Sequence, residues 1–244
     1  LEKNQCLVQH DTLIAYRSKK SIPSYTVPFQ GDFIQVSQLW HIFEYNDDCI
    51  QCVFNLLTEG RISKLISETN ECIEPENIFI EESAKVEHAI LNASRGPIYV
   101  GKNTQIMEGC IVRGPLVMCE NSVLKMGAKI YGATTLGPYC KVGGEVNNSV
   151  FIGYSNKSHD GFLGNSVIGE WCNLGADTNN SNLKNNYAEV KLWNYPSERF
   201  INTGLQFCGL VMADHSKCGI NTMFNTATVV GLSANKFGEG YPSN

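Results

Sequence analysis

The sequence has few charges, few histidines and no long apolar run. Only 18% of its 244 residues are charged, the formal net charge is −5, and no basic residues cluster, so we expect no nucleic-acid partner. No apolar stretch approaches the roughly 18 residues that a membrane span needs, so we expect no membrane partner. The first residues, LEKNQCLVQHDT, lack the apolar core of a secretory signal and an initiator methionine. We therefore expect a cytoplasmic protein that is part of a longer chain.

The ten cysteines follow no spacing that suggests a compact disulfide framework. Cys110, Cys140 and Cys172 share one position of the repeat described below, where a small buried side chain is needed. Cys49 and Cys52 form a single CxxC pair without the second pair that a zinc site would need. The cysteines therefore favour a reducing, cytoplasmic setting and no metal site.

Aliphatic residues recur at every sixth position in the middle of the chain. The run consists of Val100, Ile106, Val112, Met118, Leu124, Ile130, Leu136 and Val142. A small residue, such as Thr104 or Ala128, follows most of them four positions later. A period of six fits neither a helix nor an alternating strand and is typical of a parallel β-helix with triangular coils. Three hexads make a coil of about 18 residues, which predicts an all-β solenoid of about eight coils stacked at ~4.8 Å.

The six-residue period is interrupted twice. It lapses over 151–161 and again over about 179–206, and it resumes at Phe162 and at Met212. Insertions leave a solenoid as loops on one face, which is often the binding face. We therefore expect both segments to leave the coils, the second as an extruded loop.

The first 58 residues have a different pattern. The stretches 11–17 and 31–37 have the composition of strands, and apolar residues at helical spacing predict a helix over 40–57. A polar linker follows over 59–71, and the solenoid occupies 72–244. We therefore expect a small N-terminal α/β fragment, too short to be a complete enzyme domain.

One segment combines the hexads with a specific set of polar residues. In HDGFLGNSVIGEWCNLGADTNNSNLK, His159 is followed by Phe162, by a hexad ending in Gly169, by NLGAD from Asn173 and by Asn182. This pattern resembles the acetyltransferase domain of the bifunctional glucosamine-1-phosphate N-acetyltransferase/N-acetylglucosamine-1-phosphate uridylyltransferase family. The resemblance extends over about 72–240, and residues 1–58 resemble the C-terminal end of the fused nucleotidyltransferase domain.

The resemblance implies a left-handed parallel β-helix and a homotrimer with its sites between neighbouring subunits. It also implies acetyl transfer from acetyl-CoA, as co-substrate, to the amine of a sugar phosphate similar to glucosamine 1-phosphate. Such a reaction belongs to the synthesis of UDP-N-acetylglucosamine and cell-envelope precursors. Mg²⁺ would serve only the missing nucleotidyltransferase domain.

The chemistry of acyl transfer assigns roles to two residues, and the resemblance assigns one to a third. An amine attacks a thioester only when it is unprotonated, and a histidine is suited to take its proton, so His159 is the predicted catalytic base. The carbonyl oxygen becomes negative during the attack, and a backbone N–H near Ala176 is the predicted donor to it. The resemblance places Ile220 along the acetyl-CoA groove.

The resemblance also implies a substrate pocket. It places Phe162, which replaces a tyrosine of the family, Asn173 and Asn182 around the sugar. A phosphate group needs a cation, and Gly143 stands where the family has an arginine. We expect Lys141 to bind the phosphate; the alternatives are Lys157, Lys184 and Lys191. His215, at an outward hexad position, is either ordinary surface or a contact to the acyl-CoA or the substrate.

The sequence is compatible with two other functions. The first is a sugar-1-phosphate nucleotidyltransferase whose catalytic domain is mostly absent, with the β-helix as a non-catalytic trimerisation module. Residues 1–70 contain neither a glycine-rich phosphate loop nor a carboxylate for magnesium. The second is a carbonic anhydrase built on hexapeptide repeats, which needs three histidines on one zinc ion. The five histidines, at positions 10, 41, 88, 159 and 215, are widely separated, so we expect no zinc site.

Overall fold

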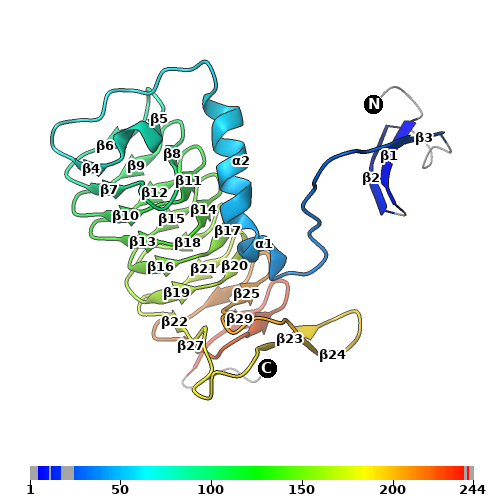
Figure 1. Ribbon diagram of the computed structural model, residues 1–244. Coiled ribbons are helices and arrows are strands. Elements are labelled where there is room, and N and C mark those ends of the chain that lie inside the picture. The colour runs from blue at the N-terminus through cyan, green and yellow to red at the C-terminus, as the bar shows by residue number, and fades with distance from the viewer. Residues whose placement is uncertain (1–4, 11, 18–24, 239–240, 242–244) are drawn as a thin grey trace. The chain divides into compact units, whose positions relative to one another are not determined.

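A computed structural model describes residues 5–10, 12–17, 25–238 and 241 (Figure 1). The chain forms two compact units, Leu1–Gln35 and Val36–Asn244. The first unit ends at Gln35, ahead of the domain boundary expected at residue 58. In the part of the chain that is described, no helix is long and apolar enough to cross a membrane.

The first unit is a three-stranded sheet. It contains β1 (Gln5–Gln9), β2 (Thr12–Arg17) and β3 (Tyr25–Pro28) in the order β2-β1-β3. β1 lies antiparallel to β2 and parallel to β3. The strand predicted over 11–17 corresponds to β2, apart from residue 11, which lies outside the described residues. The strand predicted over 31–37 is wrong, because no described strand pairs with this stretch.

The second unit is a parallel β-helix, and the predicted all-β left-handed solenoid of hexapeptide repeats is confirmed. Its first face contains β4 (Glu71–Ile73), β7 (Ile90–Asn92), β10 (Ile111–Arg113), β13 (Lys129–Tyr131), β16 (Glu145–Asn147) and β19 (Phe162–Gly164). Its second face contains β5 (Ile78–Ile80), β8 (Ile98–Val100), β11 (Leu116–Met118), β14 (Thr134–Leu136), β17 (Val150–Gly153), β20 (Val167–Glu170), β25 (Val211–Met212) and β28 (Val229–Val230). Its third face contains β6 (Lys85–Val86), β9 (Gln105–Ile106), β12 (Val123–Leu124), β15 (Lys141–Val142), β18 (Asn156–Lys157), β21 (Asn173–Leu174), β26 (Lys217–Cys218) and β29 (Asn235–Lys236). A further pair, β22 (Asn179–Asn180) and β27 (Met223–Phe224), lies beyond β19, and a 3₁₀ turn (Pro75–Asn77) precedes β5.

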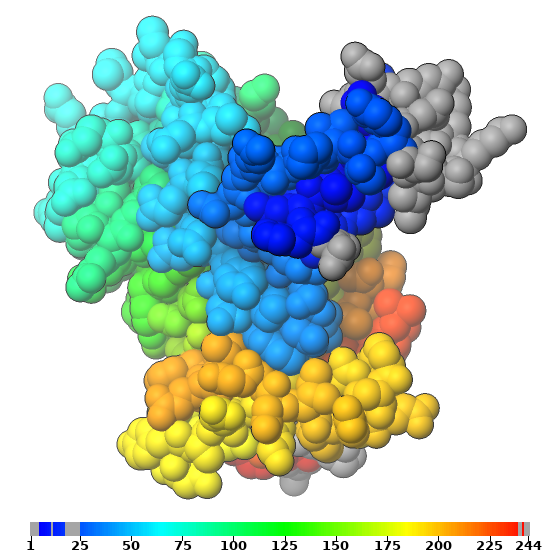
Figure 2. All heavy atoms as spheres, turned by 45° about the vertical axis from the view of Figure 1, so that its right-hand side comes forward, coloured from blue at the N-terminus to red at the C-terminus, as the bar shows by residue number. Residues whose placement is uncertain are grey.

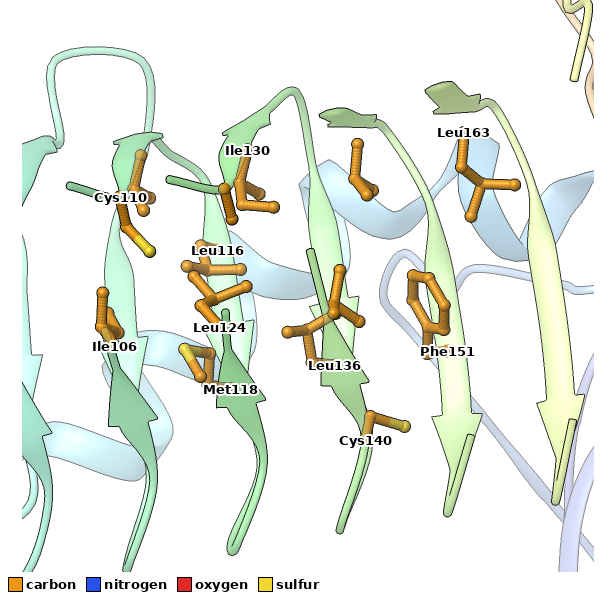
Figure 3. Packing of buried hydrophobic residues seen from close by; sticks show 14 of the residues in the cluster. Ile106, Cys110, Leu116, Met118, Leu124, Ile130, Leu136, Cys140, Phe151 and Leu163 are labelled. Carbon is orange, nitrogen blue, oxygen red and sulfur yellow. The ribbon is translucent and has the colours of Figure 1, made fainter. Parts of the chain in front are cut away.

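The core is built from the inward residue of each hexad. Ile106, Leu124 and Leu136 are buried and point into the coils, as Figure 3 shows. The small positions are buried too: Thr104 and Ser122 donate their hydroxyls to backbone carbonyls three residues earlier and so close the corners. The hexad therefore predicts both the interior and the turns.

The segment 151–161 does not leave the coils, so the expectation of a loop there is wrong. It contains most of β17 and all of β18, which pair with β14 and β15 below them. Val123 pairs with Lys141, eighteen residues on, but Lys141 pairs with Asn156, only fifteen residues on. The six-residue period is interrupted because the corners after Val142 and after Val146 contain fewer residues than the corners of the earlier coils. A deletion shifts the phase of the repeat just as an insertion does, and the two look alike in the sequence.

Two helices lie along the solenoid (Figure 1). α1 (His41–Glu44) and α2 (Asn46–Thr58) together occupy the helix predicted over 40–57, with a break at Tyr45. Asn46 fixes the start of α2, because its side chain donates to Ala133 O (2.8 Å) and accepts from the Thr135 hydroxyl (2.8 Å). The predicted linker also contacts the coils: Arg61 pairs with Glu81 at 2.7 Å.

The extruded loop is present, and we call residues 181–210 the excursion. It leaves after β22 and returns at β25, so Asn173 pairs with Lys217, forty-four residues on. It carries an antiparallel hairpin, β23 (Lys191–Asn194) and β24 (Arg199–Asn202), drawn in yellow and orange in Figure 2. Val190, Leu192 and Cys208 of the excursion are buried in one apolar cluster with outward residues of the second face, such as Val150 and Val167, and with α1. The chain therefore covers its own second face.

Candidate functional site

His159 lies at the corner between the third and first faces, where β18 leads to β19. Its side chain is exposed and lines a groove of about 350 Å³, which we call the histidine groove. Four other predicted site residues line the same groove: Lys141, Asn173, Ala176 and Ile220. The sequence separates these five residues by as many as 79 positions, and the coils bring them together.

The register of the third face explains this grouping. Lys141, Asn156 and Asn173 are paired in adjacent strands β15, β18 and β21, with their side chains outward. Paired residues of a parallel sheet lie about 4.8 Å apart. An ammonium and two carboxamides therefore form a polar column beside His159.

A second groove, of about 390 Å³, adjoins the first, and both are lined by Ser158, His159 and Ala176. Asp160 and Asp177 also line the second groove. In the described part of the chain the N–H of Ala176 donates no hydrogen bond, whereas its carbonyl accepts one from Asn221 (2.8 Å). His159 thus lies where two openings meet, next to an unused backbone donor.

Phe162 and Asn182 lie outside the histidine groove. They meet over Gly164: a Cβ built there would lie 2.5 Å from the Phe162 ring and 2.7 Å from the Asn182 amide. The Asn182 amide also donates to Asn165 Oδ1 at 2.8 Å. The seven predicted site residues therefore divide into a group of five and a separate pair on the first face.

Lys157 cannot serve as the alternative phosphate ligand, because its side chain is only 1% exposed. Its ammonium donates to Gly143 O (3.0 Å) and to His159 O (2.8 Å), inside the solenoid. Burial lowers the pKa of Lys157 to about 8, and the carboxylates of Asp160 and Asp177 oppose this shift. The sequence analysis did not predict that Lys157 is buried, although counting from Phe151 in steps of six places residue 157 at an inward position.

The two other alternative lysines lie in the excursion, away from the histidine groove. Lys184 donates to Glu189 O at 2.8 Å, and Lys191 is exposed on β23. Of the four lysines considered for a phosphate, Lys141 is the one that lines the groove with His159.

His215 belongs to a different corner, between the second and third faces, where it ends a stack of rings that we call the aromatic ladder. The ladder consists of Tyr139, Tyr154, Trp171 and His215. Successive ring centroids are 5.3, 4.7 and 6.3 Å apart, with interplanar angles of 11° or less. All four residues have positive φ, which side chains other than glycine seldom adopt. The hexad pattern gave no indication of this stack, because its residues occupy the corners.

Among the described residues no three His, Cys, Asp or Glu side chains are grouped as a metal ion would require. Comparison of the chain with protein-family models and with curated proteins finds no match.

Proposed function

We propose that this chain is an N-acetyltransferase that moves an acetyl group from acetyl-CoA to the amine of a sugar phosphate similar to glucosamine 1-phosphate. The observation that carries the proposal is the place of His159: an exposed imidazole at the junction of two grooves, beside the unused N–H of Ala176. A reaction of two substrates in one ternary complex needs a base at such a junction.

His159 acts as the general base. The amine attacks the thioester carbonyl carbon, a C–N bond forms, and the imidazole takes the proton that the nitrogen loses. The carbonyl oxygen becomes negative, and the N–H of Ala176 donates to it. The C–S bond then breaks, and the proton held by His159 returns to the departing thiolate. The reaction balances without a metal ion or a redox cofactor.

The column beside His159 supports recognition of a sugar phosphate. Lys141 supplies a cation for the phosphate, and the Asn173 carboxamide can donate to and accept from hydroxyl groups. Ile220, which is 70% exposed at the rim, offers apolar contact to the pantetheine arm of acetyl-CoA. Phe162 and Asn182, on the adjoining first face, complete the sugar pocket where a neighbouring subunit of a homotrimer closes it.

We assign this activity to the cytoplasm. The ten cysteines follow no spacing of a compact disulfide framework, which favours a reducing compartment. The excursion covers the second face, so we place the neighbouring subunit of the homotrimer against the third face, which carries the polar column beside His159.

The proposal is tested by acetyl-CoA turnover with a panel of acceptors: glucosamine 1-phosphate, glucosamine 6-phosphate and glucosamine. We expect turnover with a phosphorylated acceptor and at least tenfold lower kcat/KM with glucosamine, because the Lys141 contact is lost. The variant Lys141→Gln should remove this preference for phosphate. Absence of turnover with every acceptor would overturn the proposal and favour a non-catalytic trimerisation module.

A further inference from the structure

Lys157 is a charged residue in the interior of the solenoid. It occupies the inward position of β18, in the column formed by Leu124, Val142 and Leu174, all of which are buried. Burying an ammonium is costly unless it is well hydrogen-bonded. Methionine would fill similar space without a charge, so the lysine needs an explanation.

The shortened corner below Lys157 provides the space and the partners. At the regular corner between the inward residues Leu124 and Ile130, the small residue Ala128 fills the interior. The equivalent corner after Val142 is shorter, because the next inward residue, Val146, follows after only four positions. The ammonium of Lys157 lies at this corner and binds the carbonyls of Gly143 and His159.

The two glycines of that corner bring the coils close together. A Cβ on Gly143 would lie 2.6 Å from Ser158 O, and one on Gly144 would lie 2.8 Å from the Cα of Asp160. Real Cβ atoms do not approach so closely, so only glycine allows the 158–161 corner to sit there. Lys157 then joins this corner to the coil below.

We propose that Lys157 is a positioning residue: it holds the peptide of His159 and so sets the direction in which the imidazole points into the groove. This inference rests on the proposed function, because the orientation of the imidazole affects turnover only if His159 is the catalytic base. Removing the ammonium takes the donor away from the carbonyls of Gly143 and His159, and the corner is then free to move.

The test is Lys157→Met, which keeps the length and volume of the side chain. Leu124→Met, an apolar exchange in the same interior column two coils away, is the matched control. The first measurement is amide hydrogen exchange, which does not depend on activity. The Asp177 N–H, which donates to Asp160 O at 3.1 Å, should exchange at least tenfold faster in Lys157→Met. The Val123 N–H, bonded to Cys140 O, should be unchanged.

The second measurement is acetyl transfer. We expect Lys157→Met to lower kcat at least tenfold with little change in KM, while Leu124→Met keeps near-wild-type kcat. Unchanged exchange at Asp177 would overturn the positioning role. Faster exchange with unchanged kcat would overturn the link to catalysis. Absence of turnover in the wild-type protein would contradict the proposed function instead, and the exchange result would still decide whether Lys157 holds the corner.

A different feature, on the outer face of β10, β13 and β16, supports a second inference. A groove of about 630 Å³ lies there beside α2, and we call it the cationic groove. Arg95, Arg113 and Lys129 line it and are exposed. Lys129 is paired with Ile111, two residues before Arg113 on the neighbouring strand, so both side chains project from the same face.

The cations of this groove have no acidic partner. Within the described residues Arg95, Arg113 and Lys129 form no ion pair, whereas Arg61 pairs with Glu81 elsewhere. The carboxylates that line the groove have other donors: Glu145 accepts from the Tyr131 hydroxyl at 2.5 Å, and Asp47 accepts from Gln51 at 3.3 Å. The three cations and the two carboxylates together leave the lining of the groove with a net charge of +1, which attracts an anion.

We infer that the cationic groove binds the phosphate or diphosphate group of a small molecule, at a site separate from His159. Two guanidinium groups match the oxygens of phosphate with paired hydrogen bonds, and the volume suits a molecule of nucleotide size. The inference does not depend on acetyl transfer.

Calorimetric titration with pyrophosphate and with inorganic phosphate, at constant ionic strength, tests this site. Arg113→Gln should weaken pyrophosphate binding at least tenfold. Lys85→Gln and Lys102→Gln, which change exposed lysines outside both grooves, should change it less than twofold. No binding to the wild-type protein, or equal weakening by all three variants, would overturn the inference.

Discussion

The rings of Tyr154 and Trp171 lie parallel, 4° apart in orientation, with their centroids separated by 4.7 Å. Each belongs to the same corner of successive coils, and each has a positive φ that costs an ordinary residue about 1 kcal/mol or more. A stacked aromatic pair contributes about 0.5–1.5 kcal/mol beyond the area it buries. The aromatic ladder therefore offsets the strain of its own corners.

The first prediction concerns this ladder. Trp171→Asn removes two stacked pairs, those with Tyr154 and His215, and should lower the free energy of unfolding by about 1–3 kcal/mol. Asparagine suits the backbone here, since Asn103 and Asn121 have the same positive φ at this corner of earlier coils. Tyr139→Asn, which removes a single pair, should cost about half as much. Denaturant unfolding measures both, and equal losses for the two variants would contradict a stack.

The second prediction concerns the pH dependence of Lys157. Its pKa in the folded protein is about 8, below the ordinary 10.5, because burial disfavours the ammonium. Between these values the unfolded chain binds more protons, so the contribution of Lys157 to the free energy of unfolding rises with pH. The rise is about 1 kcal/mol from pH 8 to 9 and about 3 kcal/mol over the whole window.

Other buried groups act in the opposite direction at higher pH. Burial raises the pKa of Cys140 to about 11 and that of Cys208 to about 12, so stability from these thiols is lost as pH rises above their ordinary value of 9.0. Subtracting the unfolding curve of Lys157→Met from that of the wild type cancels them. A difference that stays flat from pH 7.5 to 9.5 would show that Lys157 keeps an ordinary pKa.

The third prediction compares two glycines at the same kind of corner. Gly161 has φ +116°, and a Cβ there would collide with the carbonyl of Thr178 in the next coil. Gly127 has φ +69° and nothing within 4 Å of its Cβ position. Gly127→Ala should cost about 1 kcal/mol of unfolding free energy, the strain of a positive φ alone. Gly161→Ala should cost at least about 3 kcal/mol, because the coils must also move apart. Similar costs would refute the close packing around His159.

Much of the fold could be predicted from the sequence, because each hexad specifies its own short strand and corner and this local pattern repeats along the chain. Val100 to Val142 predict the interior directly, since an inward position and a small position recur without reference to distant residues. The prediction that 151–161 leaves the coils is wrong, because residues missing after Val142 change the six-residue period in the same way as an insertion. The strand predicted over 31–37 is also wrong, because composition cannot show whether a neighbouring strand is present to pair with.

The site was predictable where it follows the stacking of coils. Lys141, Asn173 and Ile220 meet His159 because parallel coils superimpose equivalent positions. Asn182 lies in the excursion, where no repeat governs the path, and it bonds to Asn165 instead. The buried position of Lys157 could not be predicted, because it depends on the shortened corner after Val142 and on carbonyls from two different coils. No local sequence pattern encodes these contacts.

His159 is proposed as the base of an acetyltransferase, and a pair of histidine variants tests this role. His159→Asn should lower kcat/KM for acetyl transfer by about 10²–10⁴-fold, the usual contribution of a general base. His88→Asn is the control. His88 is exposed at a corner of the first coils and has a positive φ that asparagine accepts, so this variant should leave turnover unchanged. Both variants should unfold at the wild-type denaturant concentration. Turnover by His159→Asn at the level of His88→Asn would contradict the claim.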